Sequence, residues 1–308
     1  MSEQIEGNIL MEKSFNHSIE ANISSWPGCN DYKGVVISLG CSHTAGSEIE
    51  GVGDSDTQRQ KSYGAKVAQK LGWYHLNYGI CGGSNHRIFD LFCDILCDIE
   101  SNYGYYAPIR DDFNYLFLIG WTSLQRLDLR YPNEMNEQWV QGWPMSRGDE
   151  NYIPVTVGTN PLMIKDVELR KAFMEGAAVF ADNVIMANRL ASYIFAIQNI
   201  MLSSPYKYYM FNAIENFYDT VHTKIKRPNL DAHKTFPPFR GNQLIYNNID
   251  TKYYFYPTSR EMNYYRYCTE VKDHKNVTNK YWHLGEAAHE DWAELIYPEI
   301  INAYPGLE

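Results

Sequence analysis

The feature of the sequence that most constrains the fold is the run Gly34-Val35-Val36-Ile37-Ser38-Leu39, which is apolar over most of its length and stops at Gly40. An apolar run of this length, bounded by turn residues, is typical of a strand buried in a parallel sheet. In open α/β sheets, ligands bind beyond the carboxyl ends of the strands. The small polar segment that follows carries Ser42 and His43 side by side, so it is a candidate for chemistry. A helix-capping serine in a βα turn is the alternative interpretation of Ser42.

Strand-like and helix-like patterns alternate along the rest of the chain. The predicted elements are, in order, a strand at 34–39, a helix at 62–72, strands at 74–78 and 113–120 separated by a helix at 85–100, a helical region from 166 to 204, a strand at 206–211 and a helix at 285–303. Alternation of this kind predicts a parallel sheet covered by helices on both faces. The expected fold is therefore an α/β fold, a three-layer α/β/α sandwich around a central parallel sheet.

The length of 308 residues allows one large domain. We expect an N-terminal arm over residues 1–30 and a single α/β domain over 31–308. Two stretches rich in aromatic residues, prolines and charges interrupt the strand and helix patterns, and we expect them to be insertions at about 124–165 and 213–280.

Composition excludes several classes of protein. The net charge of −10 argues against general binding to nucleic acid or to an anionic membrane. The acidic N-terminus has no apolar signal region, so we expect a cytoplasmic protein that is not secreted. Six cysteines without a CxxC pair favour reduced structural thiols and no metal site. We expect no cofactor, and the oligomeric state stays open.

Glycine-containing polar turns follow three of the predicted strands, at Ser42, Gly82 and Thr122, and His283 precedes the last helix. A serine after the first strand and a histidine before the last helix can meet at one edge of the sheet. Nucleophilic acyl transfer needs a serine hydroxyl, an imidazole base and N–H donors for the oxyanion. The pattern therefore predicts a Ser-His site.

The order of these segments resembles the SGNH/GDSL hydrolase family. Gly40-Cys41-Ser42 stands where that family has Gly-Asp-Ser, and Asn77-Tyr78-Gly79-Ile80-Cys81-Gly82 is similar to its second block, Asn-Leu-Gly-Ile-Ser-Gly. Gly120-Trp121-Thr122-Ser123 takes the place of Gly-x-Asn-Asp, and His283 matches the histidine of Asp-x-x-His.

The resemblance implies a flavodoxin-like strand order, Ser42 as nucleophile, His283 as base, and an oxyanion hole from Ser42, Gly82 and Thr122. It implies an esterase acting on a small ester, such as an O-acyl group on a carbohydrate. Similar Gly-Cys-Ser-His-Thr and Gly-Trp-Thr-Ser segments in tailed phages imply a viral origin, hence the host cytoplasm or a virion.

Two positions depart from the family pattern. Lys280 stands three residues before His283, where the family has the aspartate that orients the histidine. Thr122 replaces an asparagine and has a shorter donor arm. A backbone carbonyl or one of the nearby carboxylates could orient His283 instead; the candidates are Asp273, Glu286 and Asp291.

Four further residues are candidates for substrate binding: His43, Asn85, Trp121 and Arg126. His43 is also a second candidate base, and Arg suits a carboxylate or a phosphate. Packing and surface ion pairs are the alternative roles for His43 and Arg126. Two other functions stay open at this point. One is an acyltransferase that uses the same serine, and the other is a non-catalytic binding or virion structural module.

Overall fold

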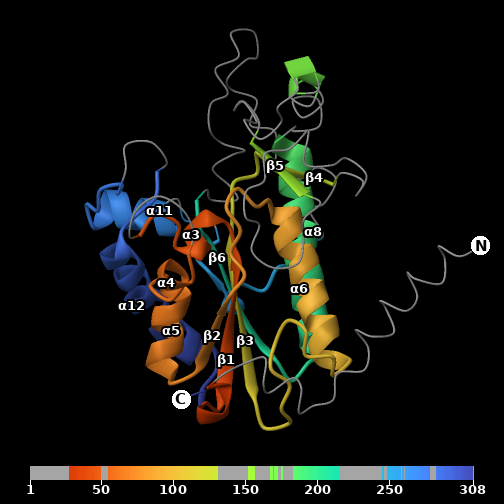
Figure 1. Cartoon of the computed structure of the whole chain (residues 1–308), viewed down its shortest axis with the longest axis vertical. Helices are drawn as coiled ribbons and strands as arrows, with labels where there is room; N and C mark the ends of the chain where they lie inside the picture. The colour runs from red at the N-terminus through yellow and green to blue at the C-terminus, as the bar shows by residue number, and fades with distance from the viewer. Residues whose placement is uncertain are drawn as a thin grey trace, which may run out of the picture.

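The computed structural model of the chain is shown in Figure 1. The structure describes residues 28–49, 55–130, 152–156, 167–168, 170–172, 175, 183–214, 245, 248–257, 259, 261–277 and 282–307. The predicted N-terminal arm therefore lies almost wholly outside the described residues, as does Lys280. Within the described part, no helix is both long and apolar enough to cross a membrane.

A five-stranded sheet forms the centre of the molecule, with strand order β2-β1-β3-β6-β7. Its strands are β1 (Gly34–Gly40), β2 (Tyr74–Asn77), β3 (Asn114–Trp121), β6 (Lys207–Asn212) and β7 (Tyr254–Phe255). Every pairing in this sheet is parallel. In chain order the five strands lie 2-1-3-4-5, which is the flavodoxin-like arrangement.

Helices cover both faces of the sheet, as Figure 1 shows. One face carries α5 (Tyr63–Leu71) and α12 (Glu286–Ala303), and the other carries α6 (Asn85–Glu100) and α8 (Asn183–Leu202). Each face has its own cluster of buried apolar residues, and all of β1 is buried between them. The predicted three-layer α/β/α fold is confirmed.

The carboxyl end of β1 is closed by a short helix, α3 (Ser42–Ala45), which turns back over the sheet. Gly40 makes this possible, because a Cβ there would lie 2.9 Å from the Gly120 carbonyl oxygen and would collide with the Thr44 side chain. The close approach of strand and helix places Ser42 directly at the sheet edge.

Two regions contain more structure than the sequence predicted. The segment between β1 and α5, for which the sequence predicted no helix or strand, contains α4 (Asp56–Arg59), which begins with a capping box between Ser55 and Gln58. The segment at 124–165 contains β4 (Arg126–Arg130) and β5 (Tyr152–Thr156), which form a separate antiparallel pair.

The segment at 213–280 supplies part of the core. It contains η2 (Thr251–Tyr253), then β7, then α11 (Tyr264–Arg266) and the π-helical turn η3 (Tyr267–Val271). β7 extends the central sheet, and Tyr264 is fully buried beneath α12. The sequence did not predict this strand, because two residues are too few to give a strand pattern.

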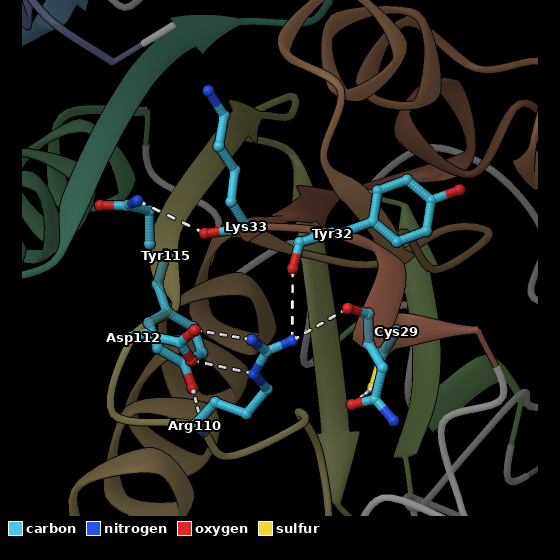
Figure 2. A network of polar contacts seen from close by, with 8 residues as sticks. Cys29, Tyr32, Lys33, Arg110, Asp112 and Tyr115 are labelled. Atoms are coloured by element: carbon cyan, nitrogen blue, oxygen red, sulfur yellow. Dashed lines mark hydrogen bonds and ion pairs between the residues drawn. The ribbon is translucent and has the colours of Figure 1, made fainter.

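At the amino end of the sheet, Arg110 forms hydrogen bonds that connect the segments before β1 and β3 (Figure 2). Its guanidinium forms two parallel bonds to Asp112, at 2.9 and 2.7 Å, and donates to the carbonyl oxygens of Asn30 and Tyr32. The 3₁₀ helix η1 (Cys29–Asp31) that leads into β1 is thus joined to the segment that leads into β3. This network lies at the opposite end of the strands from Ser42.

Candidate active site

Ser42 is the first residue of α3 and follows β1 with only Cys41 between them. Cys41 pairs with Ile80 as an isolated parallel bridge, which joins this segment to the turn before α6. The Ser42 residue is 2% exposed. N–H groups in the first turn of a helix have no partner within the helix, so the Ser42 N–H is available to a ligand.

His283 lies close to this segment and is held by Glu48. The His283 Nδ1 lies 2.9 Å from the Glu48 Oε2, and their side chains are only 11% and 5% exposed. A carboxylate in this place accepts the Nδ1 proton, which leaves Nε2 with the lone pair of a base. This contact has the geometry of a carboxylate that fixes the tautomer and the orientation of an imidazole.

Sequence analysis did not identify Glu48, and the three carboxylates it named are used elsewhere. Glu286 pairs with Lys66 at 2.6 Å, and Asp291 pairs with His274 at 2.8 Å. Asp273 forms an ion pair with Lys275. The sequence left the group that orients His283 open; in the structure these three carboxylates have other partners, and the carboxylate that contacts His283 is Glu48.

Glu48 has a backbone conformation that non-glycine residues rarely adopt. Its φ is 67°, in the left-handed region. Such a conformation costs on the order of 1–3 kcal/mol and persists only where its surroundings enforce it. The residue is also 4% exposed, so its carboxylate is held rigidly in the interior.

His43 is packed among aromatic rings beside His283. The two imidazole rings are 5.1 Å apart between centroids, and Tyr264 and Tyr265 lie at 5.6 and 5.7 Å. Burial lowers the pKa of His43 well below its usual value, and the charges of His283 and Arg126 lower it further. A histidine of this kind stays neutral and is a poor base, which leaves His283 as the base candidate.

Thr122 follows β3 at the same edge of the sheet. Its N–H donates to the Asn85 Oδ1 at 2.8 Å, and the Asn85 Nδ2 donates to its carbonyl oxygen at 3.1 Å. The Asn85 amide thereby holds the backbone of the Thr122 turn in place, and its predicted contact with substrate stays a prediction. The buried Thr122 Oγ1 has no hydrogen-bond partner among the described residues.

Three of the predicted site residues remain to be placed: Gly82, Arg126 and Trp121. Gly82 lies in the turn after β2, where its φ of 77° requires glycine, and Arg126 begins β4. Trp121 is fully buried in the core between the sheet and α6, so the expected contact with substrate is not what the structure shows.

A series of buried hydrogen bonds connects α3 to α5 and α12. The Thr44 and Tyr63 hydroxyls are 2.5 Å apart, and the Tyr63 N–H donates to the His289 Nδ1 at 3.2 Å. The His289 ring stacks on that of Tyr63, and burial lowers the pKa of His289 to about 3. His289 is therefore a neutral packing residue.

The structure records no hydrogen bond between the Ser42 Oγ and His283, although both residues are described. Among the described residues, no three His, Cys, Asp or Glu side chains are grouped so that they could hold a metal ion.

A family model described as "Family of unknown function (DUF6071)" matches residues 48–228. The chain belongs to the DUF6071 family. The matched range includes Glu48, Gly82, Thr122 and Arg126 but ends before His283 and begins after Ser42. Comparison with curated proteins gives no match for this DUF6071 chain.

Solved structures similar to the DUF6071 chain include a protein assigned to the lipolytic G-D-S-L family from Desulfitobacterium hafniense DCB-2. Its identity is 10% and its TM-score 0.34, over 86% of this chain and 98% of that one. A second is a carbohydrate esterase family 2 enzyme with a carbohydrate-binding domain from Corynascus thermopiles (Myceliophthora fergusii). Its identity is 13% and its TM-score 0.39, over 88% of this chain and 66% of that one. Both similarities are too distant to carry a function over.

Proposed function

We propose that this protein is a serine ester hydrolase with Ser42 as nucleophile and His283 as base. The observation that carries the proposal is the buried contact of 2.9 Å between the His283 Nδ1 and the Glu48 Oε2, beside the helix that begins with Ser42. A buried imidazole held by a carboxylate next to a serine is the arrangement that activates a hydroxyl for acyl transfer.

In the first half of the reaction, the His283 Nε2 takes the proton of the Ser42 hydroxyl while the Ser42 Oγ attacks the ester carbonyl. Glu48 stabilises the imidazolium that forms. The tetrahedral intermediate then collapses, the C–O bond to the alcohol breaks, and Nε2 returns its proton to the leaving alcohol. The acyl group remains on Ser42.

In the second half, Nε2 takes a proton from a water molecule, whose oxygen attacks the acyl carbonyl. The new intermediate releases the carboxylic acid, and the Ser42 oxygen recovers its proton from Nε2. An alcohol acceptor in place of water would give acyl transfer through the same intermediate.

The oxyanion of each intermediate would be bound by the N–H groups of Ser42 and Gly82 and by the Thr122 hydroxyl. The Ser42 N–H lies in the first turn of α3, and the Thr122 Oγ1 has no partner among the described residues. Loss of one such donor costs about 3 kcal/mol of transition-state stabilisation in studied enzymes.

The absence of a Ser42–His283 hydrogen bond in the free protein is compatible with this mechanism. Catalytic hydrogen bonds are often long or poorly aligned before substrate binds and tighten in the complex.

Labelling with a fluorophosphonate probe tests the proposal directly. The wild-type protein should be labelled at Ser42, and Ser42→Ala should not be labelled. Ser47→Ala is the matched control, because Ser47 is also buried close to α3 and its hydroxyl has no partner among the described residues. A folded wild-type protein that takes up no label would overturn the proposal and favour a non-catalytic binding module.

Hydrolysis of 4-nitrophenyl acetate and of an O-acetylated sugar then addresses the substrate. We expect release of acetate from both by wild type and from neither by Ser42→Ala. Acceptance of a sugar alcohol in preference to water would identify an acyltransferase, since the acyl-enzyme is common to both reactions.

A further inference from the structure

The guanidinium of Arg126 has a buried N–H group for which the described residues supply no acceptor. Arg126 begins β4, and its backbone N–H donates to the Ser123 carbonyl oxygen at 3.3 Å. The Nη1 of its guanidinium is buried and has no hydrogen-bond partner among the described residues. A buried donor of a charged group without an acceptor is costly, so its retention points to an acceptor that the free protein does not contain.

Arg126 also lies close to the Ser42 segment. It follows Thr122 by four residues, and Thr122 lies at the carboxyl end of β3, beside that of β1. Its positive charge contributes to the lowered pKa of His43, the residue after Ser42, although burial is the larger cause. The guanidinium is therefore within electrostatic reach of His43, which follows the proposed nucleophile in the chain.

Other buried polar atoms in this region also have no partner among the described residues. They include the Thr122 Oγ1, the His43 Nδ1 and the Ser47 Oγ. Thr122 is 1% exposed and His43 is 5% exposed, so water in bulk does not satisfy them. Buried polar groups in proteins are nearly always paired, so each of these atoms calls for an acceptor or donor, such as an ordered water or a bound ligand.

No ion pair within the described part of the chain accounts for Arg126. Among the described residues, no carboxylate lies within ion-pair distance of its guanidinium, and the Glu48 carboxylate is bound to His283. The chain carries a net charge of −10, so an anion would be repelled unless a local cation attracted it.

We propose that Arg126 binds a carboxylate on the substrate, so that the preferred ester carries a negative charge on its acyl or alcohol part. The planar fork of a guanidinium matches the two oxygens of a carboxylate. The assignment of this carboxylate to an ester substrate rests on the proposed serine hydrolase; the binding of the anion does not.

Anion binding is tested first, without turnover. The Ser42→Ala protein is titrated with succinate and separately with inorganic phosphate, and heat of binding and melting temperature are recorded. We expect succinate to bind and to raise the melting temperature, and Arg126→Gln added to Ser42→Ala to weaken binding at least tenfold. Arg110→Gln is the matched control, since Arg110 lies at the other end of the strands.

Turnover is tested second, by comparing mono-4-nitrophenyl succinate with 4-nitrophenyl acetate. We expect the ratio of their kcat/KM values to favour the succinate ester in wild type and to fall at least tenfold in Arg126→Gln. Arg126→Lys should recover part of the ratio, and Arg110→Gln should keep it.

The outcomes separate the two proposals. Binding of succinate that does not depend on Arg126, or no binding at all, overturns the anion site. Binding of phosphate in place of succinate overturns the carboxylate assignment. Arg126-dependent succinate binding without hydrolysis of either ester supports the anion site and rejects the serine hydrolase. Hydrolysis of both esters without a preference for the succinate ester supports the serine hydrolase and rejects the anion site.

Discussion

The His283 Nδ1 lies 2.9 Å from the Glu48 Oε2, and the two residues are 235 positions apart in the chain. Glu48 comes six residues after Ser42, so the acid and the proposed nucleophile belong to one local segment and the base arrives from the other end of the domain. In the SGNH/GDSL pattern that the chain resembles, acid and base share one motif. In this chain the carboxylate that contacts His283 comes from Glu48, in the segment that carries Ser42, and not from the segment that carries His283.

Glu48→Gln should lower kcat for ester hydrolysis by about 10²–10⁴-fold with little change in KM. The amide keeps the shape of the side chain, but it cannot stabilise an imidazolium and can hold His283 in the wrong tautomer. Steady-state kinetics on 4-nitrophenyl acetate would measure the effect.

Glu286→Gln is the matched control for that experiment. Glu286 follows His283 by only three residues in the sequence, but it does not contact the imidazole in the way Glu48 does: its carboxylate is paired with Lys61 and Lys66 at the surface. We expect kcat in this variant to stay within about twofold of wild type, because exposed ion pairs contribute little. Equal losses in both variants would refute a specific role for Glu48.

Local patterns predicted the elements that build the site. The apolar run that forms β1 is buried over its whole length, and the glycine turns that follow β1, β2 and β3 do lie at one edge of the sheet. These features are readable because a buried parallel strand and a βα turn each impose a strong local composition.

Long-range contacts did not follow from the sequence in the same way. Glu48 lies in a polar loop, and nothing in its neighbours distinguishes it from other surface acids until the fold brings His283 to it. Trp121 shows the opposite case, in which a local pattern suggested substrate binding for a residue that the fold buries. It follows Gly120 at a strand end and resembles a ligand-binding aromatic, but tertiary packing buries it completely.

Thr122→Val should separate catalysis from stability. Valine has the same shape but no hydroxyl, and the buried Oγ1 has no partner to lose among the described residues. We therefore expect the free energy of unfolding to stay within about 1 kcal/mol of wild type or to rise, while kcat falls about 10–10³-fold. Urea unfolding and ester hydrolysis measure the two quantities. A variant that loses stability but keeps kcat would exclude Thr122 from the oxyanion hole.

Asn85→Ala should reduce stability and activity together. The Asn85 amide makes two hydrogen bonds to the Thr122 backbone, at 2.8 and 3.1 Å, and both groups would be left buried without a partner. We expect a loss of about 2–4 kcal/mol in the free energy of unfolding. Asn114→Ala, at an exposed asparagine whose bond to the Lys33 carbonyl is 3.4 Å long, should cost under about 1 kcal/mol. Similar losses in the two variants would contradict the assigned role.

Stability should fall below neutral pH because two buried histidines must stay neutral in the folded protein. Burial lowers the pKa of His75 and of His289 to about 3. In the unfolded chain each titrates near pH 6.5, so below that pH only the unfolded state gains the protons. The free energy of unfolding is thus unaffected by these groups above about pH 6.5 and decreases as the pH falls toward 3. At pH 5 the loss is about 2 kcal/mol for each histidine.

His75→Gln isolates one of these contributions. The glutamine amide can replace the contact of 3.0 Å between the His75 Nε2 and the Ser38 Oγ, but it does not titrate. Between pH 7 and pH 5 this variant should lose about 2 kcal/mol less than wild type in urea unfolding experiments. His86→Gln is the control, because the His86 side chain is 52% exposed, and it should follow the wild-type curve. Parallel curves for wild type and His75→Gln would show that His75 is protonated in the folded protein.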